Sequence, residues 1–217
     1  MAKVVLFGLQ ETAELAHYYL KVDSEHEVVA FSVHQAYMPK EPTFLSLPII
    51  AFEEVETVFP PDDYVFFAPM SPLKMNTLRA SIYHQIKDKG YDCINYISSK
   101  ATVFNSTFGQ NCFVQEGCTL QPYSELGNNV MIWSDSTVGH HTLLKDHVTL
   151  AAHVMVNGHC EIGENTLFSI NSCVAYGIKV AKGTFVEMGA AIAGDTQAWS
   201  SYAGVPAAKY ETLSGYQ

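Results

Sequence analysis

The chain has 217 residues, 48% of them hydrophobic, and a formal net charge of −10. This apolar content suffices for a sizeable core, and an acidic balance without a basic run argues against nucleic acid and anionic membrane surfaces as partners. No run reaches transmembrane length and no signal peptide is recognisable, so the sequence predicts a cytoplasmic protein.

The first hundred residues contain short apolar runs that read as buried strands. These runs cover residues 4–7, 28–33, 64–68 and 93–97. Residues 35–47 look like an irregular loop. Helical patterns separate the runs, and strands that alternate with helices predict a parallel sheet. We therefore expect a small, Rossmann-like α/β domain over residues 1–98.

Two helices are predicted between these strands. The first starts at a Thr12 cap and runs through Leu20. The second starts at Ser71-Pro72, a capping residue followed by proline, and ends at Gly90. Its buried face carries four apolar side chains: Met75, Leu78, Ile82 and Ile86.

Residues 108–196 repeat every six positions. Steps of six from Phe108 to Ile192 meet a bulky apolar residue at all fifteen positions. The third residue after each is mostly Asn, Asp, His or Gly, which tolerate a left-handed backbone conformation. A period of six fits a parallel β-helix, with three sides per coil and residues eighteen apart stacked. The pattern predicts a second domain over residues 99–217 with about five coils.

The five cysteines are expected to be reduced and packed in the interior. Cys112, Cys118 and Cys160 fall in the small, inward-facing column of the repeats, and the chain has no CxxC pair. Such thiols behave as small apolar side chains.

Five of the nine histidines fall between residues 140 and 159. Four of them stand in the corner column, where they also serve as turn residues: His141, His147, His153 and His159. His140 alone stands in the column before the corner, with Gly158 one coil above it. An imidazole beside a glycine offers a base and an exposed backbone N–H, the minimum for acyl transfer.

Histidine clusters on β-helices can also bind zinc, as in the γ-type carbonic anhydrases. Those enzymes use a ligand pair separated by four residues and a third ligand further upstream. The histidines here include no such pair, and no histidine lies between residues 84 and 140. No metal is therefore expected.

Three features carry a resemblance to left-handed β-helix acyltransferases: the hexapeptide repeats, the tripeptide Val138-Gly139-His140, and the closing Ala-Gly-Val-Pro-Ala at residues 203–207. The two-domain layout, with residues 95–101 at the junction, resembles the sialic acid O-acetyltransferase and bacillosamine N-acetyltransferase group. The resemblance implies a left-handed coil and a homotrimer. It also implies acetyl-CoA as co-substrate, bound in the groove between adjacent β-helices.

The resemblance also implies roles for individual residues. His140 corresponds to the family's general base, and the N–H of Gly158 to the contact with the acetyl carbonyl. His141 stands where the family commonly has an acidic partner for that base. Further coenzyme contacts fall on Thr149, Ile170, Met188 and Lys209. The family's nucleotide-sugar contacts fall on Gly8, Leu9, Gln10 and Ser32, where the usual glycine-rich turn and acidic strand end are replaced.

The function expected is acetyl transfer from acetyl-CoA to an amino or hydroxyl group of a nucleotide-linked sugar in surface-polysaccharide biosynthesis. Two alternatives stay open. A non-catalytic β-helix that binds a sugar or a partner predicts no release of CoA from acetyl-CoA. A zinc-dependent hydratase of the γ-carbonic-anhydrase type predicts stoichiometric zinc.

Overall fold

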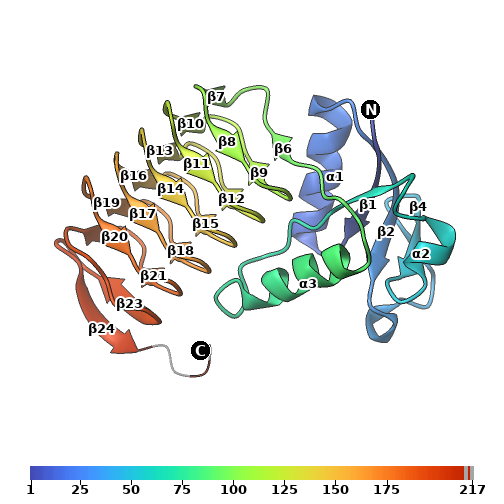
Figure 1. The fold of residues 1–217 in the computed structure, drawn as a ribbon. Coiled ribbons are helices and arrows are strands. Elements are labelled where there is room, and N and C mark those ends of the chain that lie inside the picture. Colours follow the sequence, from blue (N-terminus) through green and yellow to red (C-terminus); the bar gives the residue numbers. More distant parts are fainter. Residues whose placement is uncertain (213–214, 216–217) are drawn as a thin grey trace.

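The computed structural model describes residues 1–212 and 215, and it has two parts (Figure 1). The N-terminal part is a small sheet with helices, and the C-terminal part is a stack of short strands. The predicted combination of an α/β part and a β-helix is confirmed.

The N-terminal sheet has the strand order β3-β4-β2-β1-β5. Its strands are β1 (Lys3–Phe7), β2 (Glu27–Val33), β3 (Thr43–Phe44), β4 (Leu47–Ala51) and β5 (Val65–Phe67). All neighbours pair in parallel except the edge strand β3, which is antiparallel to β4. The sequence prediction missed β3 and β4 because Pro42 and Pro48 read as loop residues.

The helices of this part are α1 (Glu11–Asp23), α2 (Val55–Val58) and α3 (Thr77–Asp88), with a 3-10 turn η1 at Gln35–Tyr37. The apolar face of α1 packs with one side of the sheet and that of α3 with the other. The predicted Thr12 cap is wrong: Gln10 is the N-cap residue of α1, and its side chain makes no cap hydrogen bond.

The start and the buried face of α3 also differ from the prediction. Lys74, Met75 and Asn76 have positive φ of 52°, 52° and 63°, so the helix begins after them and not at Ser71. Leu78 is consequently 38% exposed, and Arg79 occupies the buried position instead.

The C-terminal part is a parallel β-helix with three sheets of stacked strands. The first sheet holds β6 (Tyr96–Ile97), β9 (Phe113–Val114), β12 (Met131–Ile132), β15 (Thr149–Leu150), β18 (Leu167–Phe168), β21 (Phe185–Val186), β23 (Ser200–Ala203) and β24 (Ala208–Thr212). The second holds β7 (Thr102–Val103), β10 (Thr119–Leu120), β13 (Thr137–Val138), β16 (Met155–Val156), β19 (Cys173–Val174) and β22 (Ala191–Ile192). The third holds β8 (Thr107–Phe108), β11 (Glu125–Leu126), β14 (Leu143–Leu144), β17 (Glu161–Ile162) and β20 (Lys179–Val180).

The stack begins before the repeats found in the sequence. Ile97 pairs with Val114, 17 positions later, whereas Phe108 pairs with Leu126, 18 positions later. This first coil is one residue short, which breaks the period of six ahead of Phe108. The second sheet therefore has six strands, one more than the predicted five coils require.

The interior and the corners follow the sequence pattern. The inward apolar column forms one continuous core. The corner residues have left-handed backbone conformations, including all four corner histidines, with φ between 55° and 63°. The five cysteines are free thiols; four are buried as predicted, whereas Cys173 is partly exposed. Burial raises the pKa of the Cys112 thiol to about 12, so this sulfur stays protonated and inert.

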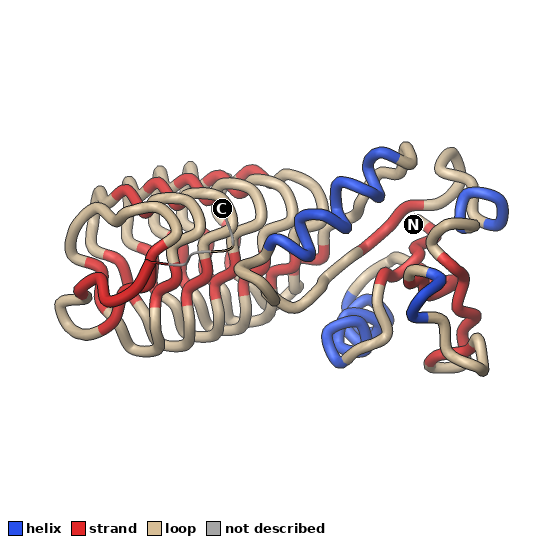
Figure 2. Tube along the Cα trace, turned by 90° about the horizontal axis from the view of Figure 1, so that it is seen from below, coloured by secondary structure: helices blue, strands red, loops and turns tan. Residues whose placement is uncertain are grey.

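A single buried arginine fastens α3 to the β-helix. Arg79 is the only arginine of the chain and is 1% exposed. Its guanidinium donates to six oxygens: Oδ1 of Asn76, the carbonyl and Oδ1 of Asn129, the carbonyls of His147 and Val148, and Oγ1 of Thr149. Burial lowers its pKa to about 9, so it keeps its charge at neutral pH. Figure 2 shows the helix lying along the stack of coils.

Candidate active site

His140 lies at the corner between the second and third sheets, after β13 and before β14. We call residues 139–141, 157–159 and 175–177 the histidine corner. The backbone N–H of His140 donates to Oε1 of Gln121 at 3.0 Å, which fixes the main chain. A Cβ on Gly139 would lie 2.4 Å from the backbone nitrogen of Gly158, so a glycine is required for these coils to stack.

The ring of His140 lies against Gly158 on the next coil. A Cβ at Gly158 would lie 2.8 Å from Nε2 of His140, within the space that the ring needs. The structure thus brings together the predicted base and the predicted glycine. The Gly158 N–H donates to Oδ1 of Asn157 at 2.7 Å, so this amide must turn away before the N–H can serve an oxyanion.

His141 takes the place beside His140 where the resemblance implies an acidic residue. The Nδ1 atoms of the two rings are 3.1 Å apart, so one must carry hydrogen and the other must accept it. If His140 donates from Nδ1, its Nε2 holds a free lone pair beside Gly158. A neutral imidazole can orient a base in this way, but it cannot raise its basicity as a carboxylate does.

His159 completes a cluster that the sequence interpretation divided between turn residues and a base. Its ring stacks on that of His141 with centroids 4.8 Å apart and planes 2° from parallel, and it meets His140 edge-on at 5.1 Å. One nitrogen from each of the three rings lies within 4.8 Å of the others. The spacing of 18 between residues 141 and 159, one full coil, was the signal that this cluster left in the sequence.

The proposed coenzyme contacts lie in different places. Ile170 and Met188 are 44% and 69% exposed, one coil apart at the corner between the first and second sheets. Lys209 is exposed, and its Nζ donates to Oε1 of Gln197 at 2.7 Å. Thr149 is 1% exposed, and its hydroxyl donates to Asn76 and accepts from Arg79, so it has no free donor for a coenzyme.

The predicted sugar contacts surround the turn after β1. Gly8 has a φ of 112°, which favours glycine, and its N–H donates to the carbonyl of Ser32 at 2.9 Å. Ser32 is fully buried, and its Oγ has no hydrogen-bond partner among the described residues. Gln10 is the N-cap residue of α1, and Leu9 is partly buried. Gly8, Leu9 and Gln10 reach the surface, whereas the side chain of Ser32 does not.

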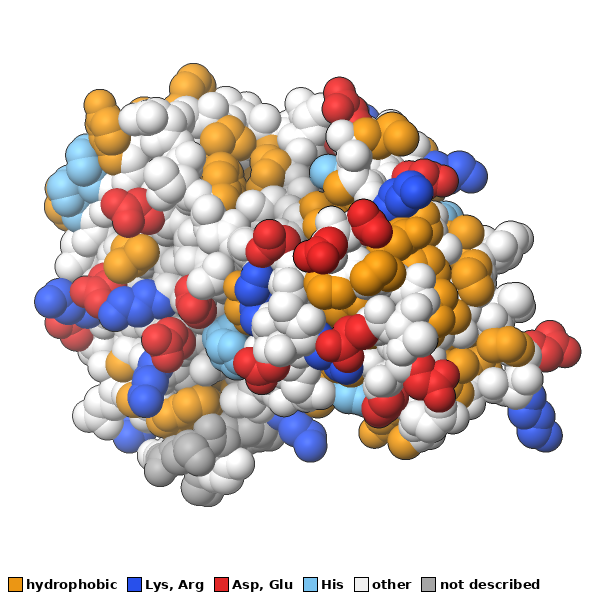
Figure 3. Space-filling view, turned by 45° about the vertical axis from the view of Figure 1, so that its right-hand side comes forward, with side chains coloured by type: hydrophobic (Ala, Val, Ile, Leu, Met, Phe, Trp, Pro, Cys, Tyr) orange, Lys and Arg blue, Asp and Glu red, His pale blue; other side chains and the backbone are white. Residues whose placement is uncertain are grey.

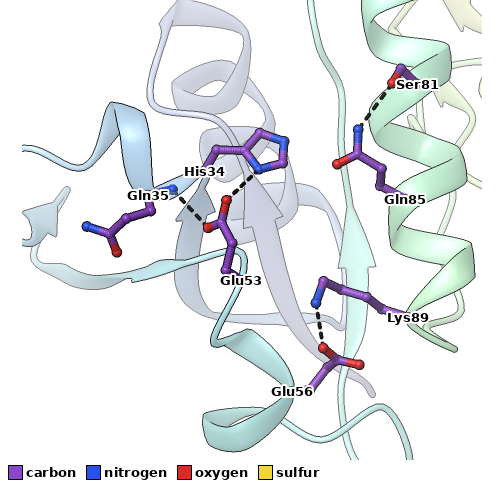
Figure 4. Close-up of polar contacts among 7 residues, drawn as sticks. All are labelled: His34, Gln35, Glu53, Glu56, Ser81, Gln85 and Lys89. Atoms are coloured by element: carbon purple, nitrogen blue, oxygen red, sulfur yellow. Dashed lines mark hydrogen bonds and ion pairs between the residues drawn. The ribbon is translucent and has the colours of Figure 1, made fainter.

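A hollow of about 510 Å³ lies nearby, lined by His34, Phe52, Glu53, Gln85, Asp88 and Lys89. Figure 4 shows Glu53 held by His34 and Gln35. Its Oε1 lies 3.0 Å from Nδ1 of His34, and its Oε2 accepts the Gln35 N–H at 2.8 Å. Desolvation opposes ionisation, but these bonds outweigh it and lower the pKa of Glu53. The sequence interpretation missed this hollow because β4 was not recognised.

The outer surface carries both signs of charge. Figure 3 shows acidic and basic side chains side by side over the face on which the α/β part comes forward. Among residues 1–212 and 215, no helix has the length and apolar character needed to cross a bilayer.

No family model matches the chain. Solved structures do match it over nearly its whole length. The acetyltransferase domain of PglB from Neisseria gonorrhoeae FA1090 superposes with a TM-score of 0.86 at 20% identity, covering 97% of this chain and 100% of that one. The chains share one fold.

Two further structures agree. PerB from Caulobacter crescentus, solved with CoA and GDP-perosamine, has a TM-score of 0.83 at 19% identity over 97% of this chain and 98% of its own. WeeI from Acinetobacter baumannii AYE has a TM-score of 0.65 at 14% identity over 97% and 100%. These matches confirm the expected α/β part followed by a left-handed β-helix.

Proposed function

We propose that this protein is an acetyl-CoA-dependent acetyltransferase that acts on a sugar. The observation that carries the proposal is the contact between Nε2 of His140 and Gly158, together with the hydrogen bond between Nδ1 of His140 and His141. Two proteins of the same fold support it: PglB has also been solved with acetyl coenzyme A, and PerB with CoA and GDP-perosamine.

In the proposed reaction, Nε2 of His140 takes a proton from a sugar amine or hydroxyl. The freed lone pair attacks the thioester carbonyl carbon, and the negative charge moves onto the carbonyl oxygen, which the Gly158 N–H stabilises. The C–S bond then breaks, and the imidazolium returns the proton to the departing thiolate. The products are the acetylated sugar and CoA. Because His141 is no carboxylate, an amine is the favoured acceptor: its protonated form gives up a proton far more readily than a hydroxyl does, and the neutral amine then attacks.

The coenzyme site requires a second copy of the chain in this proposal. Ile170 and Met188 lie at one corner of the prism and His140 at another, so a coenzyme that meets all three has to lie between two β-helices. We therefore propose a homotrimer with acetyl-CoA in each groove and Lys209 near a coenzyme phosphate. Free cysteines suit a reducing cytoplasm as the place of the reaction.

The sugar nucleotide is assigned to the N-terminal part, residues 1–98, and acyl transfer to residues 99–217. Gly8, Leu9 and Gln10 would contact it through the turn after β1, with Ser32 supporting the turn from below. The hollow at His34 and Glu53 adds a paired carboxylate that the sequence did not suggest.

Thiol release from acetyl-CoA tests the proposal, measured with nucleotide-linked amino sugars and free sialic acids as acceptors. At least one acceptor should release CoA, and His140→Ala should lower the rate at least about 100-fold. His26→Asn, just before β2 and at the opposite end of that strand from Ser32, is the control. A loss below about tenfold for His140→Ala removes His140 as the base. Absence of release with every acceptor would favour a non-catalytic binding module.

A further inference from the structure

We propose that His140, His141 and His159 form a zinc site, and that a zinc ion bound there blocks acetyl transfer reversibly. Binding of the ion stands on the geometry of the three imidazoles alone, whereas its effect on the rate rests on the proposed function. The ion acts as an inhibitor and is no part of the reaction.

The three imidazoles are close to the arrangement that zinc requires. Zn–N bonds of about 2.0–2.1 Å in a tetrahedral site place the ligand nitrogens roughly 3.4 Å apart. The Nδ1 atoms of His140 and His141 are 3.1 Å apart, and the three ligand nitrogens all lie within 4.8 Å. To reach this spacing, the largest distance between the ligand nitrogens has to shorten by at most about 1.4 Å. Rotation of the rings can supply this movement because His141 and His159 are exposed. Over residues 1–212 and 215, no other group of three such side chains comes as close together.

The neighbouring residues favour weak, reversible binding. Ligand histidines in tight sites donate their second nitrogen to a carboxylate or carbonyl, and loss of such partners costs 10–100-fold in affinity. Among the described residues, no carboxylate hydrogen-bonds to these rings; their aromatic contacts are with one another, with Tyr123 below and with Tyr176 above. The site therefore binds and releases an ion, and does not hold one permanently.

Binding and acetyl transfer exclude each other because they use the same imidazole. A zinc ion on Nδ1 of His140 breaks the Nδ1–Nδ1 hydrogen bond to His141 and leaves the hydrogen of the His140 ring on Nε2, the atom that acts as the base. The base can then neither accept a proton nor keep its tautomer. The rate should fall with the fraction of chains that carry an ion and recover when a chelator removes it.

The first test measures binding without substrate. Protein without an affinity tag is stripped with a chelator and titrated with Zn²⁺ by calorimetry, and with Co²⁺ by visible absorption. One ion per chain should bind. Bound Co²⁺ should absorb visible light more strongly than the free ion does, as expected for a tetrahedral site. His141→Asn and His159→Asn should each weaken binding at least tenfold. Asparagine suits both positions, whose φ values are 55° and 56°.

His153→Asn is the matched control, because His153 is an exposed corner histidine with a φ of 59° that lies outside the three-histidine cluster, with its Nε2 3.9 Å from Oδ2 of Asp135. This variant should bind Zn²⁺ as the unchanged protein does. Absence of one-to-one binding, or equal binding by all variants with their thermal melts intact, overturns the site.

The second test measures the rate. Zn²⁺ should inhibit thiol release in the unchanged protein and in His153→Asn, and His159→Asn should lose at least tenfold in sensitivity relative to its own metal-free rate. Binding without inhibition overturns the blocking role. If no acceptor supports thiol release, the proposed function fails, and the binding titration still decides the site.

Discussion

A methyl group on Gly158 would lie 2.8 Å from Nε2 of His140. The glycine therefore sets the position of the ring, and the two residues act as one unit. Gly158 has no positive φ, so space and not backbone strain is the reason for its choice.

Gly158→Ala should lower the acetyl-transfer rate about 10–100-fold with little change in thermal stability, because the added methyl moves the ring of the base. Gly194→Ala is the control: Gly194 stands in the same column two coils higher, and nothing lies within 4 Å of an added Cβ. Equal rates for the two variants would contradict the assigned contact.

Met188→Glu should raise the KM for acetyl-CoA about tenfold and leave kcat nearly unchanged. The side chain is 69% exposed beside Ile170, and a carboxylate there would repel the phosphates of the coenzyme. Met188→Leu should retain the original KM. An unchanged KM for the glutamate variant would remove this corner from the coenzyme site.

Arg79→Met should lower the free energy of unfolding by about 3–5 kcal/mol, because six buried oxygens each lose one donor. Chemical denaturation would show this. Ser81→Ala, on the same helix, removes only an exposed bond to Gln85 and should change little. A small loss for Arg79→Met would mean that water takes over these bonds.

His147 should make stability depend on pH. Burial, and then the charge of Arg79, lower its pKa from 6.5 to about 4. The unfolded chain binds the proton first as the pH falls, so this contribution is complete above pH 6.5 and is lost between 6.5 and 4. It amounts to on the order of 3 kcal/mol.

His147→Asn removes that titration, and asparagine tolerates the φ of 63° at this corner. The denaturation midpoint of the unchanged protein should fall more steeply between pH 7 and 4.5 than that of the variant. Parallel curves would show that His147 is protonated in the folded state.

The β-helix was predictable because a period of six fixes both the inward column and the corners. Val138 and Val156 could be placed on stacked coils by counting alone. Counting in steps of six did not reveal the short coil between Ile97 and Val114, because this coil lacks one residue and the repeat is interrupted.

The candidate site was predictable only in part. His140 and Gly158 follow from the register, and the spacing of 18 places His159 one coil above His141, but the approach of all three rings depends on their orientation, which the spacing does not give. Arg79 was missed because a charged residue beside apolar ones is ordinarily assigned to the solvent side of a helix. Here three residues with left-handed backbone conformations precede α3, and Arg79 lies on its buried side.

Half of the oxygens that hold Arg79 are backbone carbonyls, from Asn129, His147 and Val148. Peptide groups are present whatever side chain a position carries. The contact between α3 and the β-helix can therefore persist while the outward-facing side chains of the coils change. Residues at the corners can be replaced, and the reaction there altered, without loss of this contact.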